Sequence, residues 1–170
     1  IAGVSGAFSV GVIDNTTRAF VEDGTTLKHA TLDAGRKTEI SATSAEEITT
    51  GTVSAAGGGV GVAGAVGVKV VTSETTAEIG DYANVNQTRR GATQDVQVSA
   101  SDSVRLKGGA GSGGFGAYGA GATADVNVVR NTTTASIGDD ASVRADRDIG
   151  VSATSTKDVQ SAAVAAAGGA

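Results

Sequence analysis

The sequence contains no Cys, Pro, Met or Trp, and its 170 residues include only three Phe and two Tyr. Without cysteine there is no disulfide framework, no thiolate chemistry and no cysteine-based zinc site. With so few large side chains the chain cannot fill a deep core, so its apolar burial must come from Val, Ile, Leu and Ala in thin layers. No stretch reaches the roughly 18 uninterrupted apolar residues of a membrane helix. Because neither an initiator Met nor a signal peptide opens the sequence, we expect a piece of a longer protein.

Charge is also scarce, with 13 Lys and Arg against 18 Asp and Glu and a net charge of −5. A mildly acidic chain lacks the clustered basic face that binds nucleic acid. The hydrophobic share of 39% is too high, and the net charge too low, for a disordered chain. An ordered protein that does not bind nucleic acid is therefore expected.

Internal repetition is the strongest signal that is present. The phrase "NTTTASIGDDASV" at 131–143 follows "NTTRAFVEDGTTL" at 15–27 and "SETTAEIGDYANV" at 73–85, each 58 positions after the last. This spacing predicts one continuous unit of three repeats, 1–58, 59–116 and 117–170, the third shortened by five residues where the second has "NQTRRGATQ". The equivalent positions include Val10, Val68 and Val126, and also Leu27, Val85 and Val143.

Each repeat is predicted to form strands, because its apolar residues recur at every second position. Along 60–70 the even positions are Val except for Gly64, whereas the odd ones are Gly, Ala and Lys69. We expect the valine face, with Val10, Val68 and Val126, to point into one shared core and helix to be almost absent. Such a unit cannot bury its apolar face alone, but stacked copies can.

The fold expected from this pattern is all-β, a parallel β-solenoid (β-helix) of three 58-residue repeats. Division by three gives about 19 residues for each coil, near the length typical of repeats that wind once around a core. Because the alternating run after position 59 is long for one solenoid face, a corner is expected near Gly64. A flat β-roll or β-sandwich fibre is the alternative.

The phrases "GVGVAGAVGVKVVTSETTAEIGDYANV" and "ADVNVVRNTTTASIGDDASV", the second followed by "DIGVSATS", resemble the repeats of very large bacterial surface exoproteins. These are the filamentous-haemagglutinin-like and leukotoxin-type adhesins, which autotransporter or two-partner routes export. The resemblance covers all three repeats. It implies a right-handed β-helical shaft, secreted or tethered at the bacterial cell surface, with an outer-membrane transporter as a partner of the parent protein.

No catalytic, cofactor or metal site is predicted. His29 is the only histidine and has no nucleophile at motif spacing. "GVGVAG" at 59–64 fits a dinucleotide fingerprint, but no helix is expected after it. The repeated Asp23, Asp81 and Asp139 are interpreted as turn aspartates that bond their own backbone, in preference to a column of cation ligands.

Two surface features complete the prediction. Asn15, Asn86 and Asn131 each begin an N-x-[ST] sequon, which predicts glycosylation at surface positions. Threonine pairs also recur, which raises an ice-binding hypothesis. They recur once in 58 residues, however, and not once in each expected coil, so the hypothesis is not favoured.

The predicted function is a structural shaft of a secreted or cell-surface bacterial adhesin or filament. Because neither end shows a polar capping repeat, we expect copies to associate end to end into fibres. The alternatives are a carbohydrate-binding repeat module that contacts host or cell-surface glycans, and a polysaccharide-acting enzyme on a β-helix scaffold. The regular repetition favours the shaft, because a catalytic site needs one unrepeated constellation of residues.

Overall fold

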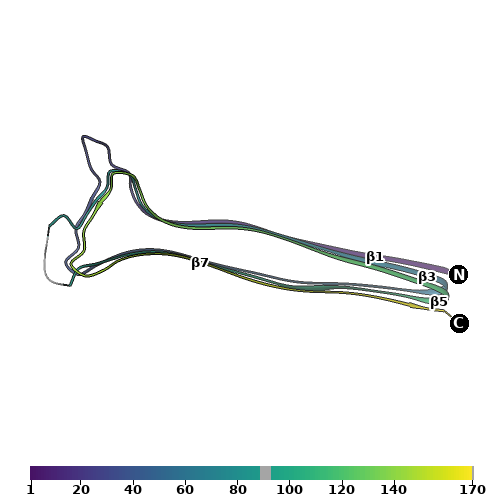
Figure 1. The fold of residues 1–170 in the computed structure, drawn as a ribbon. Helices are drawn as coiled ribbons and strands as arrows, with labels where there is room; N and C mark the ends of the chain where they lie inside the picture. The colour runs from purple at the N-terminus through teal and green to yellow at the C-terminus, as the bar shows by residue number, and fades with distance from the viewer. Residues whose placement is uncertain (89–92, 170) are drawn as a thin grey trace.

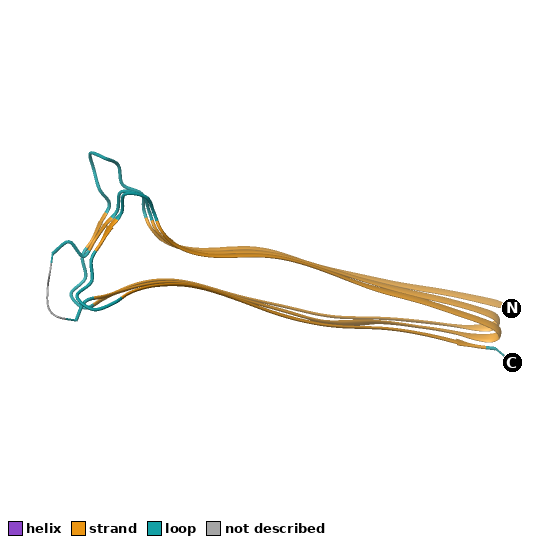
Figure 2. Ribbon diagram, in the orientation of Figure 1, coloured by secondary structure: helices purple, strands orange, loops and turns teal. Residues whose placement is uncertain are grey.

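The computed structural model describes residues 1–88 and 93–169, and this part of the chain is all-β, without helix (Figure 2). Four long strands, β1 (Ala2–Val21), β3 (Lys37–Ile79), β5 (Asp95–Ile137) and β7 (Ile149–Gly168), form a parallel sheet in that order. Three two-residue strands, β2 (Thr31–Leu32), β4 (Asn84–Val85) and β6 (Ser142–Val143), form a second parallel sheet. The expected all-β class is confirmed, and the parallel arrangement is compatible with a β-solenoid.

The long sheet folds back on itself, so that the molecule consists of two long arms (Figure 1). The first arm contains β1, residues 60–79 of β3 and residues 118–137 of β5. The second arm contains residues 37–56 of β3, residues 95–114 of β5, and β7. The arms meet near both termini, which we call the reversal end, and are joined at the opposite, loop end through the short strands.

Glycine makes the reversal possible. Gly58 and Gly116 have φ values of 151° and 158°, and a Cβ on Gly116 would collide with the carbonyl oxygen of Gly58. Side chains are excluded from such a close backbone approach. The corner expected near Gly64 is therefore wrong: the chain reverses at Gly58, and Gly64 already lies on the first arm, paired with Gly6 and Ala122.

One circuit of the chain is much longer than expected. Residues paired between β1 and β3, and between β3 and β5, are 58 positions apart, as in Val10↔Val68↔Val126. A complete circuit, which we call a passage, therefore takes 58 residues and not about 19. Each passage contains one strand of each arm. The prediction of three coils within each 58-residue unit is wrong because the alternating run does not bend. β1, for example, continues for 20 residues, about 65 Å of strand.

The loops shift this register. Thr31 pairs with Asn84 and Leu32 with Val85, which is an offset of 53. Leu27 thus lies in an early loop, 97% exposed, and its expected equivalence with Val85 is wrong because Leu32 holds that place. Between β6 and β7 the offset falls from 58 to 53, where the second passage has "NQTRRGATQ". Residues 89–92 of that stretch lie outside the described residues.

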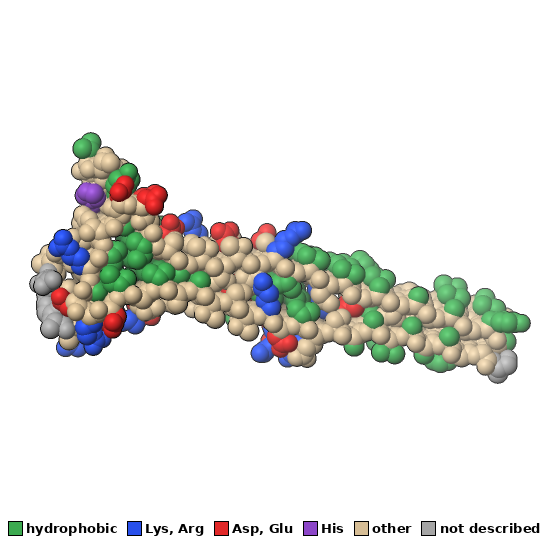
Figure 3. Space-filling view, viewed as in Figure 1, with side chains coloured by type: hydrophobic (Ala, Val, Ile, Leu, Met, Phe, Trp, Pro, Cys, Tyr) green, Lys and Arg blue, Asp and Glu red, His purple; other side chains and the backbone are tan. Residues whose placement is uncertain are grey.

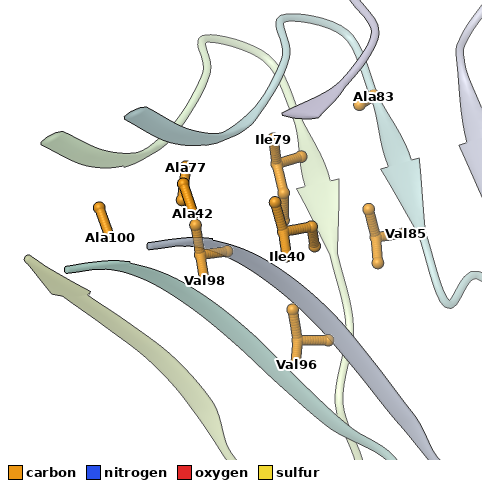
Figure 4. Close-up of a cluster of buried hydrophobic side chains, with 9 residues drawn as sticks. All are labelled: Ile40, Ala42, Ala77, Ile79, Ala83, Val85, Val96, Val98 and Ala100. Atoms are coloured by element: carbon orange, nitrogen blue, oxygen red, sulfur yellow. The ribbon is translucent and has the colours of Figure 1, made fainter. Parts of the chain in front are cut away.

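The interior becomes narrower from the loop end to the reversal end. Branched side chains and alanines fill the loop end (Figure 4): Ile40, Ala42, Ala77, Ile79, Ala83, Val85, Val96, Val98 and Ala100. Ile48, Val71, Val104 and Leu106 form a second apolar cluster nearer the middle. Beyond it, apart from Lys69 and its neighbours Asp125 and Asn127, small residues line the interior. There Ser54 donates directly to the carbonyl oxygen of Gly64 on the other arm, at 2.7 Å. The two arms are therefore closest where their facing side chains are smallest.

The valine face points outward, contrary to expectation. Ala63 and Ala65 are 2% and 0% exposed, whereas Val62 and Val66 between and beside them are 42% and 38% exposed. A Cβ on Gly61 would lie 2.9 Å from the carbonyl oxygen of Ala56, so no room for a branched side chain exists between the arms here. The predicted core positions Val10 and Val126 are also 55% and 47% exposed. The outer surface of the reversal half is accordingly rich in hydrophobic side chains (Figure 3).

This arrangement predicts that a substitution of a glycine on the inner face lowers stability more than a substitution of the neighbouring valine on the outer face. Gly61→Val should lower the free energy of unfolding by about 1–3 kcal/mol, because it overpacks the narrow interior. Val62→Thr, on the outer face, should change it by no more than about 0.5 kcal/mol. Guanidinium chloride unfolding followed by circular dichroism would measure both. A larger loss for Val62→Thr than for Gly61→Val would contradict the outward placement of the valines.

Candidate functional site

The repeated aspartates connect successive passages of the chain. The carboxylate of Asp23 accepts a hydrogen bond from the backbone N–H of Asp81 at 3.0 Å, and the carboxylate of Asp81 accepts one from the N–H of Asp139 at 2.7 Å. The expectation that each aspartate bonds its own backbone is therefore corrected, since the partner is the next passage, 58 residues on. Within the described residues no group of three or more Asp, Glu or His side chains could hold a metal ion.

The three sequon asparagines have inward or engaged side chains. Asn86 is 0% exposed and its Oδ1 accepts from the backbone N–H of Ala34 at 2.9 Å. Asn131 Nδ2 donates to Asp102 at 2.8 Å, and Asn15 Nδ2 donates to Glu46 at 2.6 Å. The expected surface position is wrong for Asn86. Glycosylation stays a prediction, and at Asn86 it would have to occur before folding.

The threonines recur once in each circuit, because one circuit takes 58 residues. The expectation that threonine pairs would be missing from most coils is therefore wrong. Thr17, Thr75 and Thr133 nevertheless stack inside the molecule, where Thr75 is 0% exposed. The threonine pairs are Thr16–Thr17, Thr75–Thr76 and Thr132–Thr133. Because one member of each pair is turned inward, the pairs do not form a continuous surface lattice.

His29 is exposed, and its Nδ1 lies 2.7 Å from the carbonyl oxygen of Tyr82. This backbone contact involves no nucleophile. No helix among residues 1–88 and 93–169 is of the length and apolarity that a membrane span requires.

A buried polar layer separates the two apolar clusters. Glu46 is 6% exposed, and its Oε1 accepts hydrogen bonds from Asn15 at 2.6 Å, from Ser73 at 3.1 Å and from Ser44. Its Oε2 is buried without a hydrogen-bond partner in the described part of the chain. A buried carboxylate oxygen without a partner is costly, so this atom is a candidate contact for a group outside the chain.

Asp102 lies next to Glu46 in this layer and is better satisfied. It accepts hydrogen bonds from Ser73 at 2.6 Å, from Thr75 at 3.1 Å and from Asn131 at 2.8 Å. Ser73 thus bridges two carboxylates that come from successive passages of the second arm. The layer fixes the relative position of the strands through directional bonds, which the apolar clusters cannot do.

A buried ion pair lies on the reversal side of the second apolar cluster. Lys69 Nζ contacts Asp125 Oδ1 at 2.6 Å, and the two side chains are 0% and 1% exposed. Burial opposes ionisation of Asp125, but hydrogen bonds from Lys69, Ser161 and Asn127 outweigh it, so the pKa of Asp125 lies below its ordinary value. A Cβ on Gly108 would collide with Lys69 Cε, which shows that a glycine provides the space for the lysine.

The sequence contained a signal for this pair, because Lys69 is the only charged residue on the small face of 59–70.

The ends of the sheet carry the most distinctive surfaces. At one end, β1 and residues 37–56 have a free edge, and at the other, β7 and residues 118–137 have one. Ile149, Val151 and Val159 of β7 are 48%, 46% and 47% exposed. Their paired neighbours on β5, Val96, Val98 and Leu106, are 1%, 0% and 0% exposed. Core positions are thus uncovered at β7.

Comparison with models of known protein families, with curated proteins and with solved structures finds no match.

The ion pair predicts that the loss of one partner destabilises the fold strongly, and that removal of both partners destabilises it much less. Lys69→Met should lower the free energy of unfolding by about 3–5 kcal/mol, because it leaves a buried carboxylate unpaired, whereas Lys69→Met with Asp125→Leu should recover most of the loss. Asp125 has a lowered pKa, so its contribution is present above its unfolded value of 3.8 and is lost as the pH falls through the folded value. Urea unfolding of the three proteins between pH 3 and 7 would test this. Equal losses in the single and double variants would contradict the pairing.

Proposed function

We propose that the chain is a shaft segment of a secreted or cell-surface bacterial adhesin or filament, a right-handed β-solenoid of three repeats that stacks end to end. Its role is mechanical: it extends a structure away from a surface through repeated passages of parallel strand. The outer-membrane transporter of the parent protein and host or cell-surface glycans are the partners that belong to this proposal.

The shape and the repetition support a shaft. Each passage contributes one strand of about 20 residues to each arm, and successive passages add strands in the same parallel register. Contacts are made between neighbouring passages, as in repeat proteins, so such an array can be lengthened without changing its cross-section. The recurring carboxylates of Asp23 and Asp81 each bond the backbone of the next passage.

The uncovered inward face of β7 is the observation that carries the proposal. Three branched residues there keep nearly half of their surface exposed, although the same positions one passage earlier are buried. A further passage of the same architecture would cover them. Free parallel edges without Pro are also templates for strand addition. A head-to-tail contact between the two different ends does not close, so it yields open filaments.

End-to-end stacking predicts that the isolated chain associates as its concentration rises. Sedimentation velocity over a hundredfold concentration range should show a weight-average sedimentation coefficient that increases continuously, without a plateau at the dimer. A single monomeric species at every concentration would overturn the stacking part of the proposal.

A further inference from the structure

The two end faces are chemically different, and the strand register brings their residues into correspondence. The C-terminal face, as we name it, is formed by β7 and residues 118–137; the N-terminal face is formed by β1 and residues 37–56. Stacking in the register of the sheet would place each residue of the C-terminal face beside one residue of the N-terminal face. This step rests on the proposed stacking.

The first correspondence joins two opposite charges. Val104 pairs with Glu46 on one side and with Lys157 on the other. In a stack of the same register, Lys157 would therefore lie beside Glu46 of a second copy. Lys157 is exposed and makes no ion pair within the described residues. Glu46 has the buried Oε2 without a partner.

The lysine suits this carboxylate. Glu46 retains 6% of its surface at the edge strand of the N-terminal face, and a lysine ammonium on its flexible stem supplies three hydrogen-bond donors. Because the surroundings of Glu46 are buried, an opposite charge there contributes more than it would at an open surface. The unpaired oxygen would thereby gain a partner.

Two further correspondences use the same register. Thr72 pairs with Asp14 on one side and Arg130 on the other, so Arg130 would lie beside Asp14 of the second copy. The carboxylates of Asp23 and Asp81 each accept from the next passage, whereas no acceptor contact of the Asp139 carboxylate occurs among the described residues. It would be placed to accept from the backbone N–H of Asp23 of the second copy.

One correspondence is unfavourable. Arg105 pairs with both Glu47 and Asp158, so the stack would bring Asp158 beside Glu47 of the second copy. Both side chains are about half exposed, where water and salt weaken the repulsion. The buried position of Glu46 makes its pairing with Lys157 the stronger contribution.

We propose that the C-terminal face binds the N-terminal face of a second copy of this chain in the register of the sheet, with Lys157 pairing to Glu46 across the junction. The occupant is thus a second copy, selected by charge as well as by strand edge.

Charge reversal tests the pairing. Lys157→Glu should raise the dissociation constant of end-to-end association by about tenfold or more, because it faces Glu46 with a like charge. Lys107→Glu is the matched control: it changes net charge equally and lies on β5, between the two end faces. It removes the contact between Lys107 Nζ and Glu47 at 3.5 Å, but both side chains are about half exposed, so its effect should be below about threefold. Sedimentation velocity would give both dissociation constants. Equal effects of the two variants would overturn the pairing.

Cross-linking tests the register, and the absence of cysteine makes it clean. Ser103 pairs with Ala45 and with Thr156, so a mixture of Thr156→Cys and Ala45→Cys chains should form an intermolecular disulfide under mild oxidation. Thr156→Cys mixed with Thr49→Cys, four residues out of register, should not. Ser103→Cys with Thr156→Cys in one chain is the positive control for geometry.

The outcomes separate the two proposals. If the unmodified chain remains monomeric, both the stacking and this junction are wrong. If it associates, but Lys157→Glu has no more effect than Lys107→Glu or the out-of-register cysteines cross-link as well as the in-register pair, stacking survives and this junction is wrong.

Discussion

The structure depends on how closely two strands can approach across a narrow interior. Where Gly and Ala face each other, backbone carbonyls and side-chain hydroxyls of opposite arms come into direct contact, as between Ser54 and Gly64. Where Ile and Val face each other, the arms separate enough to contain an apolar cluster. The gradient of side-chain size along each arm thereby determines the taper of the molecule. Because the arms of the reversal half leave little space between them, its larger valines lie on the outer face.

Polar groups inside the molecule define the alignment of its passages. Apolar layers of similar side chains tolerate small shifts between strands, whereas the Glu46 and Asp102 layer and the Lys69–Asp125 pair require particular partners. The aspartate ladder adds one bond for each passage at the loop end. A long parallel ladder with regular composition is otherwise prone to register slippage, so these interactions supply the specificity that hydrophobic burial lacks.

Much of the strand pattern could be predicted from the sequence, but the inside could not be distinguished from the outside. The period of two shows that Val62 and Val66 share one face and that Ala63 and Ala65 share the other. Which face is buried depends on the distance to the opposite arm, a tertiary quantity. Leu27 was misaligned because the first loop carries its extra residues before β2 and not after it. The partners of Lys69 and Glu46 lie on other passages, so no local sequence motif identifies those partners.

The orientation of the alternating run is tested most directly by thiol accessibility, since the chain has no cysteine of its own. Single cysteines would be placed in turn at Val62, Ala63, Ala65 and Val66, and their rates of reaction with a maleimide would be compared with those of the unfolded chain. We expect the thiols at Val62 and Val66 to react readily, whereas those at Ala63 and Ala65 should react only as fast as the fold opens. Protection at the two valine positions with free reaction at the two alanine positions would contradict it.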